Sequence, residues 1–315
     1  MEFEIAYISY DEPNASENLA DLKSKLPPGT KLHHIHGVKG LDESHRAAAQ
    51  SVKSDRVLIV DGDNKMTRDF FQVDFNSLLK DIPADRVLSW ASKNIINGLI
   101  YGNGGLKLWP THLLKQVNCH SAKSGQTDWC QQFPYQQLNN WYSYCMCNGS
   151  PFQAFRAGFR EGVKLCLDSE GKRNPLLKQS PHLLYEGNRS RLLQWMSVGA
   201  DVTNGEYAMF GARLGCIRVI CEDDFNLEQI NDYDWFHDYW NGEFSYVRDG
   251  NYQEHFDRLV YELEEHTGLF ISNFNHEQSR AIKKMIPRPK RSGVLMPSPS
   301  DRDSLIEQGN LEKQL

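Results

Sequence analysis

The fold of this chain is indicated first by the segment Val57-Leu58-Ile59-Val60-Asp61-Gly62-Asp63-Asn64. Its apolar run, long enough for a buried strand, ends in two carboxylates one residue apart. Such runs are typical of parallel strands in an α/β sheet, whose ligands bind just beyond the carboxyl ends of the strands. Because Mg²⁺ is commonly bound by one or two carboxylates plus substrate phosphates, Asp61 and Asp63 predict a divalent cation that carries a nucleotide diphosphate. The alternative is a plain turn, since Asp, Gly and Asn all favour turns.

The composition is that of a globular chain with an acidic balance. The 315 residues are 40% hydrophobic, which is enough for a sizeable core, and the net charge is −6. A polyanionic partner would therefore have to meet a local basic patch. The N-terminus has no basic signal region, and no segment is long and apolar enough for a membrane span, so we expect a soluble, cytoplasmic protein without a membrane partner. The seven cysteines, an odd number without a C-x-x-C pair, indicate reduced thiols.

Alternating strand and helix patterns predict an α/β fold with a mostly parallel, Rossmann-type sheet flanked by helices. We expect strands at residues 3–10, 31–36, 57–60 and 86–91, with helices at 15–26 and 41–54 between the first three. Further helices are expected at 152–167, 185–198, 204–213 and 252–263, with an acidic loop at 221–238. One catalytic domain would span residues 1–275, with a nucleotide-binding half at 1–110 and an acceptor half at 111–275. Residues 276–315 form a basic segment and a tail whose polar composition predicts disorder.

Side chains near the expected strand ends could bind a nucleotide. Ser9, Tyr10 and Asp11 follow the first strand, where an aromatic ring and a carboxylate could meet a uracil or a ribose. Lys39 and Arg46 could reach phosphate oxygens.

A glycine-rich segment at residues 94–110 could close over a sugar or an acceptor. Gly104 and Gly105 allow the backbone to approach a ligand closely. Tyr101, Lys107 and Trp109 flank them and are the candidate contacts for the donor sugar and the acceptor. The alternative is a glycine-rich hairpin without a ligand.

These segments together resemble the GT-A class of glycosyltransferases, which share a nucleotide-binding sheet and an Asp-x-Asp metal motif. More closely, they are similar to a family of glycosyltransferases encoded by tailed phages. The similarity covers residues 1–270 and is carried by ISYDEPN at 8–14, GVKG at 37–40, VDGD at 60–63, NGLIYGNGGLKL at 97–108, FRAGFRE at 155–161 and the segment 204–213.

The resemblance implies a GT-A-like fold and transfer of a sugar from a nucleotide diphosphate sugar, with a UDP-sugar as the expected donor and Mn²⁺ or Mg²⁺ as the cofactor. Asp61, Gly62 and Asp63 would form the metal motif. Some phages of this kind carry enzymes that glycosylate hydroxymethylated bases of their own DNA, arabinosyltransferases among them. The favoured acceptor is therefore the hydroxymethylated cytosine of phage DNA, and the favoured location is the host cell cytoplasm.

An inverting enzyme also needs a carboxylate to take the proton of the acceptor hydroxyl. Asp128 is the first candidate, and its alternative is a helix N-cap or a turn. A retaining enzyme may work without such a base. GT-A enzymes often take a third metal ligand from a C-terminal histidine, and the sequence does not choose among His182, His237, His255, His266 and His276.

A basic run near the C-terminus is the candidate DNA contact: Arg280, Lys283, Lys284, Arg288, Lys290 and Arg291. Arg156 and Arg160, on the helix expected at 152–167, could add to it. The alternative for the run is a solvated segment before the tail. Two rival functions stay open: the same chemistry on a glycan or protein acceptor, and a non-catalytic binding protein with a nucleotide-sugar fold.

Overall fold

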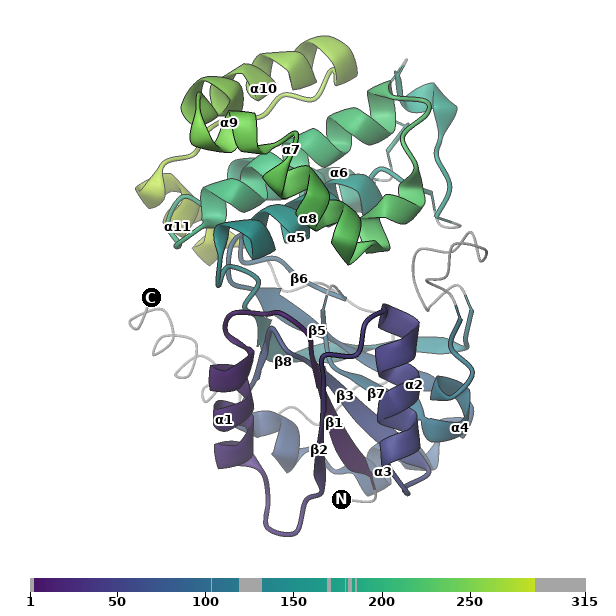
Figure 1. The fold of residues 1–315 in the computed structure, drawn as a ribbon. Coiled ribbons are helices and arrows are strands. Elements are labelled where there is room, and N and C mark those ends of the chain that lie inside the picture. Colours follow the sequence, from purple (N-terminus) through teal and green to yellow (C-terminus); the bar gives the residue numbers. More distant parts are fainter. Residues whose placement is uncertain are drawn as a thin grey trace.

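The computed structural model describes residues 3–102, 104–118, 132–168, 171–178, 180, 183–184 and 186–286. In this part of the chain an eight-stranded sheet has the order β2-β1-β3-β7-β5-β8-β4, with β6 paired to β5 (Figure 1). Its strands are β1 Glu4–Ser9, β2 Leu32–His36, β3 Arg56–Asp61, β4 Asn64–Met66, β5 Val87–Asn94, β6 Ile100–Tyr101, β7 Lys107–Pro110 and β8 Tyr135–Cys145.

Most of these strands run in one direction. β1 is parallel to both β2 and β3, and β5 is parallel to β8. β7 is antiparallel to both β3 and β5, so β3 and β5 also run the same way. The carboxyl ends of β1, β2, β3, β5 and β8 therefore share one edge of the sheet, and the reversed strands β4, β6 and β7 make the sheet mixed. The predicted α/β class, a sheet flanked by helices, is confirmed.

Helices cover both faces of the sheet, which explains the continuous apolar run of β3. Leu58 and Val60 point into a core shared with α1 (Ala15–Lys25), the 3₁₀ turn η1 (Arg68–Gln72) and α3 (Phe75–Lys80). Val57 and Ile59 point into the opposite core, shared with α2 (Leu41–Ser51) and α4 (Thr111–Leu114). A strand buried on both faces needs no alternation of polar and apolar residues.

A layer of helices lies over the shared carboxyl edge, in the upper half of Figure 1. It consists of α5 Pro151–Lys164, α6 Glu186–Ser197, α7 Gly205–Cys221, α8 Tyr233–Asn241, α9 Ser245–Asp249, α10 Tyr252–Thr267 and α11 His276–Met285, with 3₁₀ turns η3 Pro175–Lys178 and η5 Leu227–Asn231. Its core includes Ile95, Ile96 and Cys147, which follow the ends of β5 and β8. The helical layer is therefore packed directly onto the edge where a ligand of an α/β sheet binds.

The packing of α5 against α7 fixes the position of α5 over the sheet. A Cβ on Gly158 of α5 would lie 1.9 Å from the carbonyl oxygen of Ala208, so only glycine permits this approach. Ser150 caps the helix by accepting a hydrogen bond from the backbone of Gln153 at 3.1 Å. The side chains of α5 that face the sheet are consequently held in one place.

One sequence prediction about this layer is wrong. Residues 221–238 were expected to form an acidic loop, but they contain η5 and the first turns of α8. The reason is burial: Ile230 and Phe236 are fully buried in the helical core. The predicted division at residue 110 stays a prediction, and β8, from beyond that point, belongs to the sheet.

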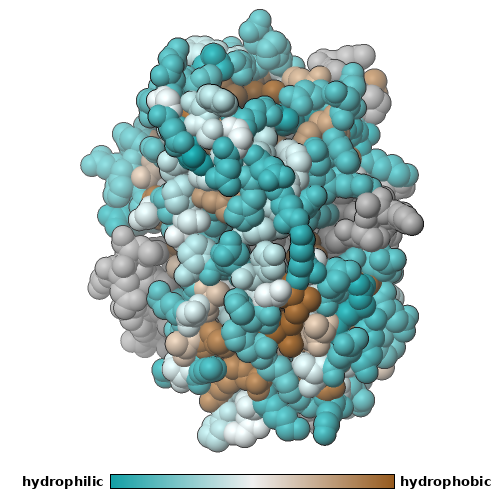
Figure 2. All heavy atoms as spheres, viewed as in Figure 1, coloured by the Kyte–Doolittle hydropathy of each residue, from teal (hydrophilic) through white to brown (hydrophobic). Residues whose placement is uncertain are grey.

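The face seen in Figure 2 is mostly hydrophilic, and hydrophobic side chains reach it mainly in the sheet half, between α1 and α2. None of the helices in the described ranges is both long and apolar enough to cross a membrane.

Candidate functional site

Three carboxylates lie near the point where β1 and β3 end. Asp61 closes β3 opposite Ile8 of β1, and Asp63 follows after a single glycine. Glu12 joins them from the turn after β1, because a Cβ on Gly62 would stand only 2.7 Å from its Oε2 atom. A residue with a side chain at position 62 would therefore push this carboxylate away from the pair.

Burial and neighbouring charges raise the affinity of Asp61 and Asp63 for protons. The pKa of Asp63 is raised to about 7, first by burial and then by the negative charges of Asp61 and Glu12. Burial also raises the pKa of Asp61, against the lowering effect of Lys107 and Arg160. Lys107 lies opposite Ile59 in the β3–β7 pair, on the same face as Asp61. A cation placed between the carboxylates would relieve this repulsion.

Two arginines of α5 face the carboxylates. Burial, and then the positive charge of Arg160, lowers the pKa of Arg156 to about 10. The Arg156 guanidinium lies 4.8 Å from the ring centre of Tyr233, and its Nε atom has no hydrogen-bond partner among the described residues. Arg160 donates a hydrogen bond of 3.0 Å to Asn231. Since both arginines are partly buried above the sheet edge, their position does not favour the predicted contact with a DNA backbone.

Aromatic side chains close the site next to the end of β1. Tyr10 packs edge-on against Tyr233 of α8, with ring centres 5.1 Å apart. The Tyr233 hydroxyl donates a hydrogen bond of 3.1 Å to Asp11, and the His237 Nε2 atom lies 3.8 Å from the same carboxylate. Phe152 stacks on His237 at 4.3 Å. Tyr10 and Asp11 thus lie at a wall formed by α5 and α8, where a flat base or a ribose could bind.

Other predicted nucleotide contacts have protein partners in this structure. The Ser9 hydroxyl lies between His34 Nε2, at 2.8 Å, and His36 Nδ1, at 3.0 Å. Lys39 forms an ion pair with Asp234 of α8, and both side chains are exposed. Lys39 is therefore at the rim of the site, where it links the loop after β2 to α8.

The structure places Arg46 and Trp109 away from the carboxylates. Arg46 donates a hydrogen bond of 2.5 Å to the carbonyl of Val117, beyond α4. Trp109 is fully buried, packs against Phe133 and lies opposite Val57 at the amino end of β3. Because β7 runs antiparallel to β3, its C-terminal residues lie at the sheet edge opposite to Asp61. We do not include these two residues in the proposed site.

The glycine-rich segment does reach the carboxylates. Asn64 donates hydrogen bonds to the Gly104 carbonyl at 2.6 Å and to the Asp63 carboxylate at 3.3 Å. Gly104 has a φ of +63°, and a Cβ there would stand 3.3 Å from the Cys145 sulfur. That sulfur lies 3.7 Å from Asp63 Oδ2. A single side chain, that of Asn64, therefore links Gly104 to the Asp63 carboxylate.

The remaining residues of this segment have structural contacts. A Cβ on Gly105 would lie 1.9 Å from the Trp90 carbonyl, so this glycine allows the segment to pack on β5. The Tyr101 hydroxyl donates to Glu161 of α5 and accepts a hydrogen bond of 2.8 Å from Trp195. Burial and the neighbouring Glu161 charge raise the pKa of Tyr101 far above its usual range. Tyr101 connects the segment to the helical layer.

The residues that the structure describes include no group of three His, Cys, Asp or Glu side chains able to hold a metal ion. The pair Asp61 and Asp63 nevertheless fits a hard divalent cation, because both offer carboxylate oxygens. Burial and then neighbouring negative charge raise the pKa of Asp63, and such an ion would offset both effects. Phosphate oxygens of a donor would have to complete the coordination.

The candidates for the third metal ligand and for the base are spread over the chain. His237 lies beside Asp11 rather than beside the Asp61–Asp63 pair. His255 and His266 belong to α10, and His276 begins α11. His182 and Asp128 lie outside the described residues, and the roles predicted for them stay predictions.

The basic run is helical in its first part. Arg280, Lys283 and Lys284 lie on α11, which packs beside the ends of β5 and β8. Arg288, Lys290 and Arg291 lie outside the described residues.

No family model matches the chain, and no curated protein matches it in sequence. Among solved structures, it is similar to S. aureus TarS residues 1–349 in complex with UDP-GlcNAc, with 13% identity, a TM-score of 0.34, and coverage of 85% of this chain and 82% of TarS. It is also similar to HddC from Yersinia pseudotuberculosis, with 16% identity, a TM-score of 0.30, and coverage of 50% and 77%. A third is 4-diphosphocytidyl-2C-methyl-D-erythritol synthase from Anaerococcus prevotii, with 12% identity, a TM-score of 0.28, and coverage of 44% and 89%. These values are too low to support an argument about function.

Several residues of the site could not be identified from the sequence. Glu12 stood in a turn cluster without a pattern of its own, and Tyr233 stood in the segment expected to be a loop. Arg156 and Arg160 were placed on one predicted helix but were considered as additions to a DNA contact. The signal that would have identified them is the pair of aromatic residues on the same helix: Phe155 and Phe159 are fully buried, so their arginine neighbours lie near a packed interface.

Proposed function

We propose that this protein is a metal-dependent glycosyltransferase of the GT-A type that uses a nucleotide diphosphate sugar, with a UDP-sugar as the expected donor. One observation carries the proposal: three carboxylates at the carboxyl edge of the sheet lie close enough to two arginines of α5 for their charges to interact. A magnesium or manganese diphosphate is the ligand that needs both kinds of group, because its cation binds carboxylates and its phosphate oxygens bind arginine.

Three groups of residues at the site would bind different parts of the donor. Tyr10 and Asp11 would contact the base or the ribose. Arg156 and Arg160 would bind the phosphate oxygens and so stabilise the negative charge on the leaving nucleoside diphosphate. A divalent cation at Asp61 and Asp63 would neutralise the same charge without a proton transfer.

The glycine-rich segment would separate the donor sugar from the acceptor. The contacts that link Gly104 to Asp63 through Asn64 and Cys145 support this role. The favoured acceptor is the hydroxymethylated cytosine of double-stranded phage DNA. This acceptor rests on the family resemblance and on the basic run. The base in a duplex would have to be reached through a groove or by flipping.

The test is incubation of the protein with a panel of nucleotide sugars and hydroxymethylcytosine DNA, with products identified by mass spectrometry of the nucleosides. We expect transfer with Mn²⁺ or Mg²⁺ and none for Asp63→Ala, with Asp61→Ala less severely affected. Wild-type turnover by Asp63→Ala in the presence of EDTA would exclude the metal-dependent mechanism. A protein that binds UDP equally well with and without Mn²⁺ and transfers no sugar would support the rival function of a non-catalytic binding protein.

A further inference from the structure

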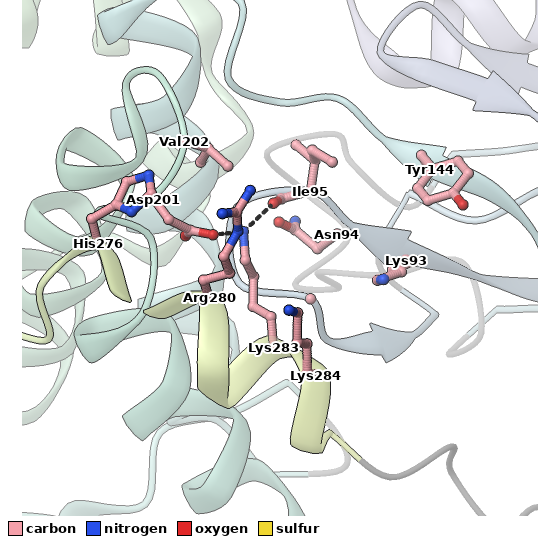
Figure 3. Close-up of a pocket in the computed structure, with 11 residues that line it drawn as sticks. Lys93, Asn94, Ile95, Tyr144, Asp201, Val202, His276, Arg280, Lys283 and Lys284 are labelled. Carbon is pink, nitrogen blue, oxygen red and sulfur yellow. Dashed lines mark hydrogen bonds and ion pairs between the residues drawn. The ribbon is translucent and has the colours of Figure 1, made fainter. Parts of the chain in front are cut away.

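A second site lies beside α11, separate from the carboxylates. Here α11 and the ends of β5 and β8 enclose a cavity of about 80 Å³ (Figure 3). A cavity needs only about 10–15 Å³ by this measure to hold a water molecule, so a small anion with its hydration fits. Its lining consists of Lys93, Asn94, Ile95, Gly98, Tyr144, Asp201, Val202, His276, Arg280, Lys283 and Lys284.

The helix that carries most of these charges is held firmly in place. The first turn of α11 has a complete capping box between Asn275 and Gln278. Ser279 is buried and accepts a hydrogen bond of 3.3 Å from the backbone of Gly199. Lys283 forms an ion pair of 2.6 Å with Asp201 that is largely shielded from solvent. The cavity is therefore part of the fold, and Lys283 has a structural role in it.

The charge of the lining is strongly positive. Asp201 is the one carboxylate in the lining given above, and its charge is balanced by Lys283. Figure 3 shows Arg280 and Lys284 extending from α11 toward β5, which contributes Lys93. Arg280 and Lys284 are one helical turn apart and exposed, and within the described ranges neither has an ion-pair partner. In a chain of net charge −6, such a local excess of cations favours an anionic ligand.

The cavity adjoins the proposed transfer site through β8. Tyr144 lines the cavity, and the next residue, Cys145, contacts Asp63. On β5, Lys93 and Asn94 lie opposite Tyr144 and Cys145. The cavity and the Asp63 carboxylate therefore lie against consecutive residues of β8.

We propose that this cavity binds a phosphate group, and that the group is a phosphodiester of the DNA backbone. Arg280 supplies a planar guanidinium that can bind two phosphate oxygens, and Lys284 supplies a point charge beside it. The choice of DNA rests on the proposed function, whereas binding of the phosphate group does not. The site would position the acceptor strand without reading its sequence.

The experiment measures binding without any donor, so its result is independent of glycosyl transfer. A fluorescent DNA duplex is titrated with the full-length protein at several salt concentrations, and anisotropy gives the Kd. The double variant Arg280→Gln/Lys284→Gln is compared with Lys23→Gln/Lys115→Gln, which removes the same charge from exposed positions on α1 and after α4. Circular dichroism confirms that both variants fold.

We expect the α11 variant to bind DNA about tenfold more weakly at low salt, with the slope of log Kd against log salt reduced by about 1, while the control stays near wild type. Equal weakening in both variants would mean that only net charge matters and would overturn the proposal. Inorganic phosphate, titrated by calorimetry, distinguishes the source of the ligand. One result would mean that the site binds a free anion and that the assignment to DNA is wrong. In that case phosphate binds the wild type and not the α11 variant, while the wild type and the α11 variant have the same affinity for DNA. No binding of either ligand overturns the whole proposal.

Discussion

Replacing Asp63 by asparagine should make the protein more stable at neutral pH while removing its activity. Asparagine keeps the shape of the side chain and one oxygen, which can accept the hydrogen bond from either Asn64 or Cys145, since these two donate to different oxygens of Asp63. It cannot ionise, so it loses the repulsion from Asp61 and Glu12 and the cost of burying a charge. Increased stability with lost function is the pattern expected of a residue kept for function.

The size and the sign of the effect follow from the pKa. Folding raises the pKa of Asp63 from 3.8 to about 7, so the folded state favours the neutral carboxyl group. Stability is therefore lost as the pH rises from 3.8 through 7. At pH 8 the cost is about three pKa units, or about 4 kcal/mol, and at pH 5 it is roughly one unit, or about 1.6 kcal/mol. These are upper limits for the stabilisation that Asp63→Asn brings.

The assay is urea unfolding followed by tryptophan fluorescence at pH 5 and pH 8, with Asp238→Asn as the control. Asp238 is an exposed residue of α8, so its replacement should change stability by less than about 0.5 kcal/mol. Added Mn²⁺ should stabilise the wild type at pH 8 and have a smaller effect on Asp63→Asn. A variant that is less stable than the wild type at pH 8, or a gain that is equal at both pH values, would refute the reasoning.

Three further predictions concern glycine and arginine positions. Gly104→Val, which forces a β-branched residue to a φ of +63° beside Cys145, should lower kcat on the order of 100-fold and weaken UDP binding much less; equal losses would indicate a purely structural glycine. Gly158→Ala should destabilise the fold by more than about 2 kcal/mol in thermal unfolding, because its Cβ would clash with the Ala208 carbonyl, and an unchanged Tm would contradict the close packing of α5 on α7. Arg213→Met should cost about 3 kcal/mol or more by urea unfolding, because this fully buried arginine donates to backbone carbonyls at both ends of its guanidinium; a neutral result would show that water replaces it.

The sequence was informative where local pattern and burial agree. The apolar run at 57–60 predicted a strand covered on both faces, and the structure buries its alternate residues in two separate cores. Asp61 and Asp63 were predicted at the end of that strand; Asp61 is its last residue and Asp63 follows after Gly62. The direction of a strand within the sheet could not be predicted, because no local sequence pattern encodes it. Trp109 was expected beside the ligand, yet the reversed direction of β7 carries it to the opposite edge of the sheet.

The other half of the site depended on tertiary contacts. The spacing of Arg156 and Arg160 predicts one face of a helix but not the surface that this face meets. That surface is set by the glycines of α5 and α7, whose close packing turns the arginines toward the sheet edge. The helix α8, which brings Tyr233 and His237, formed from a segment whose acidic composition suggested a loop.

The electrostatics of the site also bear on the rival reading of a non-catalytic binding protein. An ionised Asp63 costs the fold up to about 4 kcal/mol at pH 8, against a total stability of about 5–15 kcal/mol for ordinary proteins. A scaffold that bound only a neutral base or sugar would gain nothing from three adjacent carboxylates. In a protein that binds a metal diphosphate, the bound cation offsets the destabilisation caused by the ionised Asp63. Carboxylates with perturbed pKa values are for this reason concentrated at functional sites. The metal dependence of UDP binding distinguishes the two cases. In a transferase, UDP affinity should rise steeply with Mn²⁺, and the Asp63→Asn variant should lose that dependence. UDP affinity that ignores both the metal and this substitution would favour the scaffold and remove the main support for catalysis.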